Sequence, residues 1–184
     1  STRRGMELLP FTLGKNEVRT GAATEHGAAV GVDARIGLGK SMLAATINPD
    51  FGQVEADPAV LNLTVFETFF SERRPFFTED SRTFSINSHS GVTDFYTRRI
   101  GQAPGRFALR AGDRLVSRPD ETRILGAAKL TGKHSRWTWG GVTALTAEEH
   151  AVVDVTTTVD GQTAVNRVER LIEPRTLYNV GRLQ

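Results

Sequence analysis

The stretch VGVDARIGLGKSMLA, residues 30–44, decides the fold because its hydrophobicity alternates from residue to residue. Apart from Lys40, its even positions are apolar: Val30, Val32, Ala34, Ile36, Leu38, Met42 and Ala44. The odd positions up to residue 41 are small or charged, and they include Asp33 and Arg35. A period of two is typical of a β-strand with one apolar face. Both water-soluble sheets and transmembrane barrels contain such strands.

Residues 34–41 within this stretch, ARIGLGKS, also match the relaxed phosphate-loop pattern of nucleotide-binding proteins. Such a loop needs a helix that begins near its lysine, and its backbone N–H groups cradle the phosphates. Here the alternation continues through Leu38, and a helix after Ser41 would reach only Ile47 before Pro49 stops it. We therefore expect a strand in this region and no bound nucleotide.

The composition excludes several classes of protein. The 184 residues carry 23 Lys and Arg against 21 Asp and Glu, and this net charge of +2 gives no support to a nucleic-acid partner. The absence of Cys excludes disulfides, thiolate metal sites and cysteine nucleophiles from this chain. There is no apolar run of about 18 residues, the length of a membrane-spanning helix. Because the chain starts with Ser-Thr-Arg-Arg and ends inside a patterned segment, we expect a fragment of a longer protein.

The rest of the chain also reads mainly as strands. Alternating or β-branched segments, separated by turn-forming residues, occupy 5–14, 121–132, 136–146, 150–159, 162–172 and 176–184. Pro10 restricts the first segment to a sheet edge or a bulge, and Pro174 separates the last two. Asp160-Gly161 is a two-residue hairpin signal. Sequential hairpins without helical crossovers predict an all-β fold, an antiparallel meander that forms one domain over residues 1–184.

Residues 48–84 interrupt this strand pattern as an insertion of helical and irregular character. Asp57 and Pro58 predict the start of a helix, as its N-cap and its first residue. An apolar helix face would follow before Pro75 ends it, comprising Val60, Leu61, Leu63, Phe66, Phe69 and Phe70. The aromatic side chains of the insertion need a buried environment: Phe66, Phe69, Phe70, Phe76, Phe77 and Phe84.

The insertion also resembles a known bacterial family. Residues 47–84, INPDFGQVEADPAVLNLTVFETFFSERRPFFTEDSRTF, with FYTRRIG at 95–101, are similar to a signature of a domain-of-unknown-function family. Its members are predicted outer-membrane β-barrels that commonly carry a carbohydrate-binding family-nine-like domain on their N-terminal side. Some are labelled membrane-associated hydrolases. The match departs mildly at Ser71 and Arg73, where the family has FFPEKRPFF.

The resemblance implies part of a transmembrane β-barrel in the bacterial outer membrane, completed by strands outside these residues. The insertion would plug the lumen or cap one barrel end. Polar strand residues would line the lumen: Asp33, Arg35, Arg123 and Lys129. In residues 121–132 we expect the opposite, apolar face to hold Ile124, Gly126, Ala128 and Leu130.

Trp137 and Trp139 share one strand face. In a membrane barrel they would belong to an interfacial aromatic girdle. In a soluble domain they would fill the core or form a sugar-stacking platform. Lys40 would lie near the end of the bilayer-facing part, where lysine side chains snorkel.

Two sets of side chains raise the question of chemistry. Seven carboxylates in the insertion suggest a glycosidase, which needs two carboxyls at a set separation: Asp50, Glu55, Asp57, Glu67, Glu72, Glu79 and Asp80. The alternative is structural, because Asp57 would cap a helix and Glu72 or Glu79 could form ion pairs. The arginines near them in sequence are Arg73, Arg74 and Arg82. The histidines lie far apart, mostly in expected turns, which favours solvation over metal ligation: His26, His89, His134 and His150.

We therefore expect an outer-membrane β-barrel protein that contacts outer-membrane lipid and is associated with glycan binding or transport. No nucleic-acid or nucleotide partner and no cofactor is expected, and no residue is assigned as catalytic, cofactor-binding or metal-binding. A non-enzymatic role is preferred. The alternatives are a glycoside hydrolase that uses the acidic residues of the insertion and a soluble β-rich domain that binds a ligand.

Overall fold

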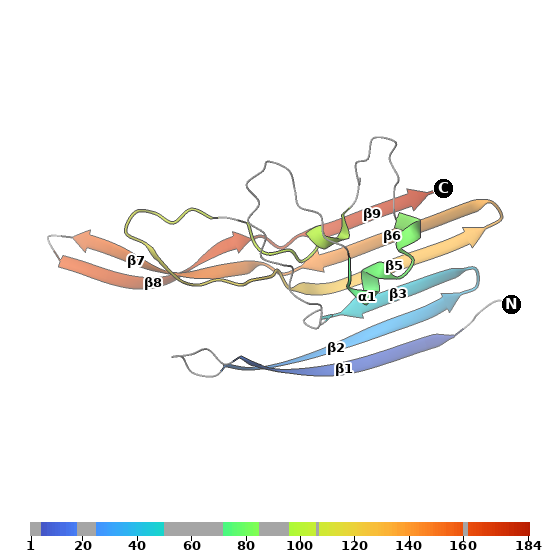
Figure 1. The fold of residues 1–184 in the computed structure, drawn as a ribbon, viewed down its shortest axis with the longest axis horizontal. Coiled ribbons are helices and arrows are strands. Elements are labelled where there is room, and N and C mark those ends of the chain that lie inside the picture. Colours follow the sequence, from blue (N-terminus) through green and yellow to red (C-terminus); the bar gives the residue numbers. More distant parts are fainter. Residues whose placement is uncertain (1–4, 18–24, 50–71, 85–95, 106, 160–161) are drawn as a thin grey trace.

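In the computed structural model the chain forms two antiparallel β-sheets (Figure 1), as expected of an all-β meander. The structure describes residues 5–17, 25–49, 72–84, 96–105, 107–159 and 162–184. The six-stranded sheet has the order β1-β2-β3-β5-β6-β9: β1 (Met6–Glu17), β2 (Glu25–Leu38), β3 (Ser41–Ile47), β5 (Ile124–His134), β6 (Trp137–Thr146) and β9 (Leu177–Leu183). The three-stranded sheet has the order β4-β7-β8: β4 (Arg114–Ser117), β7 (Glu149–Val159) and β8 (Gln162–Glu173).

The last four strands form one long, bent hairpin. β6 pairs with β9 and β7 pairs with β8, and the N–H of Thr146 donates to the oxygen of Thr176 (2.9 Å) where one pair passes into the other. The β7–β8 pair extends away from the six-stranded sheet with β4 (Figure 1). Asp160-Gly161, the expected hairpin turn, lies outside the described residues, but Val159 and Gln162 on either side of it are paired.

The chain turns within ARIGLGKS, and this corrects the expectation of one uninterrupted strand. β2 ends just before Gly39, whose φ of 71° is readily adopted only by glycine. The expectation that Met42 and Ala44 continue the apolar face is wrong, because the turn reverses the chain. Ala44 pairs with Arg35 on the charged face, and Leu43 lies on the apolar face.

The strand register sorts the six-stranded sheet into two faces, since alternate residues point to opposite sides and paired residues to the same side. The apolar face holds Met6, Leu8, Pro10, Thr12, Gly14, Ala28, Val30, Val32, Ala34, Ile36, Leu38, Ser41, Leu43, Ala45, Ile47, Gly126, Ala128, Leu130, Gly132, His134, Trp137, Trp139, Gly141, Thr143, Leu145, Leu177, Asn179, Gly181 and Leu183. The polar face holds Glu7, Leu9, Phe11, Gly31, Asp33, Arg35, Gly37, Met42, Ala44, Thr46, Ala127, Lys129, Thr131, Gly140, Val142, Ala144, Tyr178, Val180 and Arg182. Among these described positions, every charged side chain lies on the polar face.

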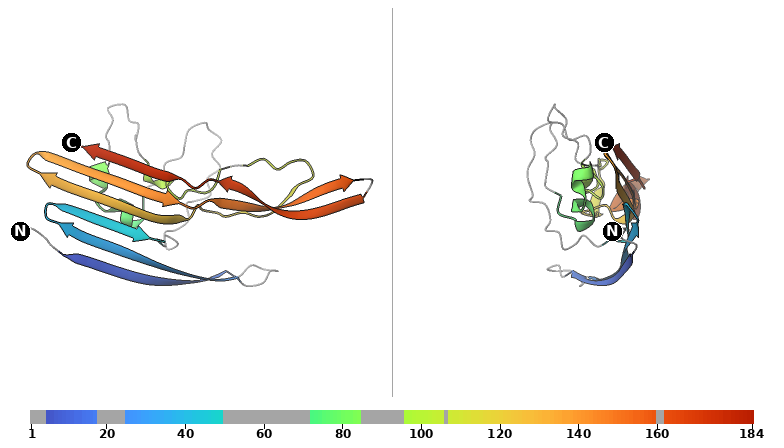
Figure 2. Two further views of the ribbon diagram at one scale, coloured as in Figure 1. Left: turned by 180° about the vertical axis from the view of Figure 1, so that it is seen from behind. Right: turned by 90° about the vertical axis from the view of Figure 1, so that its right-hand side faces the viewer.

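The helices that the structure describes lie on the polar face. They are α1 (Pro75–Thr78), α2 (Ser81–Phe84) and the 3₁₀ helix η1 (Thr97–Arg99). The edge-on view in Figure 2 shows the sheet curving toward the side that carries them. The hydrophobic core fills the space between: Phe77, Phe84, Ile100, Ile124, Ala127, Val142 and Ala144, with Phe76 and Tyr178 packed against it. The expected burial of Phe77 and Phe84 is confirmed.

Local expectations have mixed outcomes. Pro10 lies in β1, an edge strand of the six-stranded sheet, as expected. Ile124 does not share the apolar face with Gly126, because the register shifts between these two residues and turns Ile124 into the core. The helix expected from Asp57 to Phe70 lies outside the described residues. No helix in the described ranges is long and apolar enough to cross a membrane.

Candidate functional site

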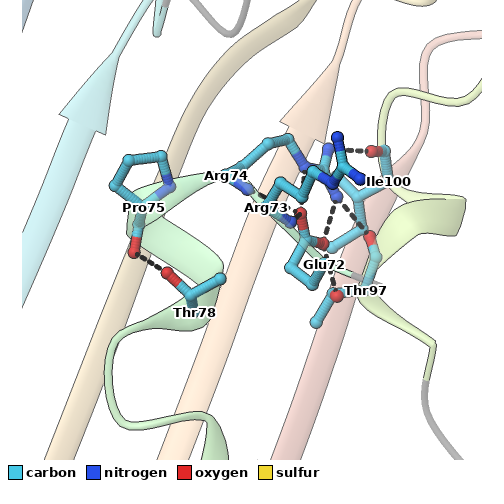
Figure 3. Close-up of polar contacts among 7 residues, drawn as sticks. All are labelled: Glu72, Arg73, Arg74, Pro75, Thr78, Thr97 and Ile100. Atoms are coloured by element: carbon cyan, nitrogen blue, oxygen red, sulfur yellow. Dashed lines mark hydrogen bonds and ion pairs between the residues drawn. The ribbon is translucent and has the colours of Figure 1, made fainter. Parts of the chain in front are cut away.

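Arg74 joins two segments that are distant in sequence, residues 72–84 and 96–105, which together we call the docked segment. Its guanidinium donates to the backbone oxygens of Ile100 (2.6 Å) and Thr97 (2.9 Å). The same guanidinium binds both carboxylate oxygens of Glu72, at 2.8 and 2.7 Å (Figure 3). Its carbon also lies 4.4 Å from the ring centroid of Phe77. Such a bidentate, charge-assisted contact fixes the geometry of both segments.

The Glu72 carboxylate is held in its ionised form. Burial opposes the charge, but the hydrogen bonds and the charge of Arg74 outweigh it and place the pKa below the ordinary value of 4.5. The hydroxyl of Thr97 also donates to Glu72, at 2.5 Å. The Glu72–Arg74 ion pair expected from the sequence is confirmed, and Glu79 pairs instead with Arg35 of β2.

Lys129 ties the docked segment to the sheet. It comes from the centre of β5, is only 3 % exposed, and points from the polar face toward α1. Its ammonium donates to the backbone oxygens of Phe76 (2.8 Å) and Glu79 (2.6 Å), at the end of that short helix. It also lies 5.2 Å from the centroid of the Phe76 ring. A buried ammonium is thereby satisfied by two carbonyls and an aromatic face.

Other strands add contacts to the same segment. Arg182 of β9 donates to the backbone oxygen of Thr83 (3.3 Å). Arg35 of β2, on the same face of the sheet, pairs with Glu79. Gly140 of β6 lets α2 approach the sheet closely. A Cβ on this glycine would lie 2.8 Å from Phe84 Cζ and from Thr83 Cγ2. Cationic side chains on the polar face thus fasten the docked segment.

A cavity of about 380 Å³ borders the docked segment. Its lining includes Gly37, Gly39, Lys40 and Ser41 from ARIGLGKS, together with Asp80 and Thr83. ARIGLGKS belongs to a hairpin, and a strand follows it where a phosphate loop has a helix. The backbone is therefore not arranged as a phosphate cradle.

The candidate catalytic carboxylates fall into two groups. Glu72, Glu79 and Asp80 have structural partners: Arg74, Arg35 and the hydroxyl of Thr131 (3.4 Å). The others lie outside the described residues: Asp50, Glu55, Asp57 and Glu67. In the described part of this cluster, Glu72 and Glu79 therefore form ion pairs, and Asp80 accepts one long hydrogen bond at an exposed position.

The histidines are also dispersed. His134 ends β5, is exposed, and accepts a hydrogen bond at Nδ1 from the Lys40 ammonium (3.1 Å). His150 lies half-buried in β7, His26 lies in β2, and His89 is outside the described residues. No group of three or more potential metal-ligating side chains occurs within the ranges that the structure describes.

Sequence reasoning anticipated part of this site. It placed Asp33, Arg35 and Lys129 on the polar face, which is confirmed, whereas Arg123 precedes β5 and is exposed. It missed that Lys129 is buried and binds carbonyls, and it missed the link from Arg74 to Ile100. The available signal was the run TRRIG at 97–101, where one apolar residue follows two arginines, and the structure buries that residue, Ile100, completely.

Comparisons with known proteins give one match. No curated protein and no solved structure matches the chain. A family model described as Domain of unknown function (DUF5916) matches residues 2–184. Because this match spans nearly the whole sequence, the chain belongs to that family.

Proposed function

We propose that this chain forms one side of a transmembrane β-barrel in the bacterial outer membrane, with the docked segment inside the barrel. The observation that carries the proposal is the apolar face of the six-stranded sheet. Its side chains are apolar, small or uncharged across all six strands, and many large ones are exposed, such as Val30 (68 %), Leu38 (52 %) and Leu183 (68 %). A water-soluble sheet covers such a face with another layer. Hydrocarbon chains of lipid are the cover that we infer.

The dimensions and the alternation of the strands support this proposal. A strand that crosses a bilayer needs about 9–11 residues. β1, β2, β5 and β6 reach this length with 12, 14, 11 and 10 residues, whereas β3 and β9 have 7. Apolar residues point outward and polar ones inward, which is the pattern of outer-membrane barrels. The edges β1 and β9 must then pair with further strands, because unpaired backbone groups are costly in lipid.

The docked segment determines what the inside of such a barrel does. Arg35, Lys129 and Arg182 reach it from three strands, so the polar face is occupied by protein. We infer a plugged barrel that acts as a membrane-embedded scaffold, and the family resemblance supports its association with glycans. Glu72, Glu79 and Asp80, the candidate catalytic carboxylates that the structure describes, each contact another side chain, which favours this reading over a hydrolase.

The second sheet has the character of a water-exposed extension. Asp154 of β7 binds Arg167 (2.8 Å) and Arg114 (2.9 Å), and Asp113 pairs with Arg170 (2.8 Å). The hydrogen bonds that Asp154 accepts lower its pKa from 3.8 to about 2, and the one from Arg167 has a larger effect than the one from Arg114. Charged networks of this kind suit an aqueous environment beyond the bilayer.

Detergent phase separation of the full-length protein tests the proposal. We expect the folded protein to enter the detergent-rich phase and to migrate faster on a denaturing gel when it is not boiled. Recovery of folded protein in the detergent-free aqueous phase would refute the membrane assignment. A variant with Ala128→Arg on the apolar face should fail to insert into vesicles, whereas Arg123→Ala at an exposed position before β5 should insert normally.

A further inference from the structure

One end of the six-stranded sheet carries cations directly beside the apolar face. Two tight turns lie there, at 39–40 between β2 and β3 and at 135–136 between β5 and β6, and we call this the short-turn end. The two turns are adjacent, since the N–H of Lys133 donates to the oxygen of Lys40 (3.3 Å). The opposite end carries the longer connections, among them residues 48–123 between β3 and β5.

Two cationic side chains at this end lie next to aromatic or imidazole groups. The ammonium of Lys40 donates to His134 Nδ1 (3.1 Å), and the guanidinium carbon of Arg136 lies 5.8 Å from the ring centroid of Trp137. Lys40, His134 and Arg136 are exposed, and Trp137 is 48 % exposed.

These groups border the apolar face directly. Leu38, two residues before Lys40, is the last apolar residue of β2, and Trp137 shares its strand face with Trp139. Amphipathic Trp rings and snorkelling cations at the edge of an apolar belt are typical of the level of lipid headgroups. His134 pairs with Trp137, which places both on the same face as the apolar side chains.

We propose that Lys40 and Arg136, supported by His134 and Trp137, bind the phosphate groups of anionic glycerophospholipids at the short-turn end. This inference rests on the proposed membrane function. Short turns of bacterial outer-membrane barrels face the periplasm and long loops face outward. The headgroups at the short-turn end are therefore those of the periplasmic leaflet, and the β4–β7–β8 sheet projects to the outside.

Lys133 supplies a matched control. It is exposed and adjoins the same turn, but the register of β5 places it with Thr131 and Thr138 on the polar face. Lys40 also borders the cavity, but its ammonium contacts His134, which lies on the other face. Neutralising Lys133 removes the same charge from the same end of the sheet, on the side that faces away from lipid.

Local lipid selectivity tests the proposal. The full-length protein with a single cysteine at Ser135→Cys, labelled with bimane, is inserted into vesicles of phosphatidylcholine and phosphatidylglycerol, and either lipid is brominated in turn. We expect brominated phosphatidylglycerol to quench more strongly than its abundance accounts for. We expect each of the two cations to contribute roughly fivefold to the preference for phosphatidylglycerol. The double variant Lys40→Gln with Arg136→Gln should therefore lose this preference, whereas Lys133→Gln should retain it.

Each other outcome has a definite meaning. Equal quenching by the two lipids, or a preference that survives in the double variant, would overturn the headgroup site while leaving the barrel intact. Quenching by neither lipid would instead contradict the membrane function itself.

A membrane-impermeant maleimide added to intact cells tests the leaflet. Glu148→Cys, at the opposite end, should react, and reaction at Ser135→Cys would overturn the assignment to periplasmic phospholipid.

Discussion

Lys129 Nζ lies 2.8 Å from the backbone oxygen of Phe76, so a lysine from the centre of the sheet binds helix α1 of the docked segment. The contact explains how a charged residue is accommodated at 3 % exposure on a strand. It also helps to fix the position of the docked segment, because one ammonium binds two of its backbone oxygens.

Replacing Lys129 by Met keeps an unbranched side chain, one atom shorter, and removes the donor. We expect a loss of about 1–3 kcal/mol in the free energy of docking, because two buried carbonyls lose their partner. Amide hydrogen exchange at Phe77 and Thr78 should therefore accelerate by roughly ten- to a hundredfold. Lys133→Met, which changes an exposed lysine of the same strand, should leave these rates unchanged. Equal protection in both variants would show that Lys129 does not hold the segment.

Two neighbouring glycines offer a second test of docking. Gly140→Ala places a Cβ 2.8 Å from Phe84 Cζ, so α2 must move away from β6, at a cost of about 1–3 kcal/mol. Gly141→Ala on the opposite face meets its nearest atom, the oxygen of Val180, at 3.8 Å and should be tolerated. Urea unfolding of the vesicle-inserted protein measures both. Equal midpoints for the two variants would contradict the close packing of α2 against β6.

The Glu72–Arg74 pair predicts a pH dependence. The folded pKa of Glu72 lies below 4.5, so its contribution is present above that value and is lost as the pH falls through the lowered pKa. Hydrogen-exchange protection of residues 97–100 should therefore decrease on acidification. Glu72→Gln should reduce protection already at pH 7, by about 3 kcal/mol, because Arg74 is left buried without its anion. A wild-type profile that stays flat into the acid range would refute this role of Glu72.

Asp154 gives a separate prediction for the second sheet. Its pKa is lowered from 3.8 to about 2 by Arg167 and Arg114, so its contribution holds above pH 3.8 and disappears as the pH falls toward 2. The pairing of β4 with β7 should weaken over this range. Asp154→Asn should weaken that pairing at neutral pH and remove the acid transition. Hydrogen exchange at Leu115 is the measurement, and an unchanged acid transition in the variant would exclude Asp154 as its cause.

The sequence predicts the strands well because a period of two is a local signal. Residues 30–38 alternate over their full length, and they lie in strand β2. The turn at Gly39 escaped prediction because the alternation on either side of it continues in phase through Met42, which hides the reversal. β4 escaped because its four residues are all exposed and too few to show a period.

The docking contacts were less accessible from sequence. Glu72 and Arg74 are close in the chain, so their pairing was foreseeable. The partners of Lys129 and Arg35 depend on where residues 72–84 lie over the sheet, which is a property of tertiary structure. Ile124 was assigned to the wrong face because a bulge shifts the phase of β5, and alternation alone cannot reveal one inserted residue.

The most direct test of the central claim compares the two faces of one strand. Single cysteines at Leu130→Cys on the apolar face and Thr131→Cys on the polar face are labelled with bimane in the full-length protein, which is then inserted into vesicles of brominated phosphatidylcholine. The membrane account predicts strong quenching at position 130 and little at position 131. Equal quenching at both positions, or none at position 130, would contradict it.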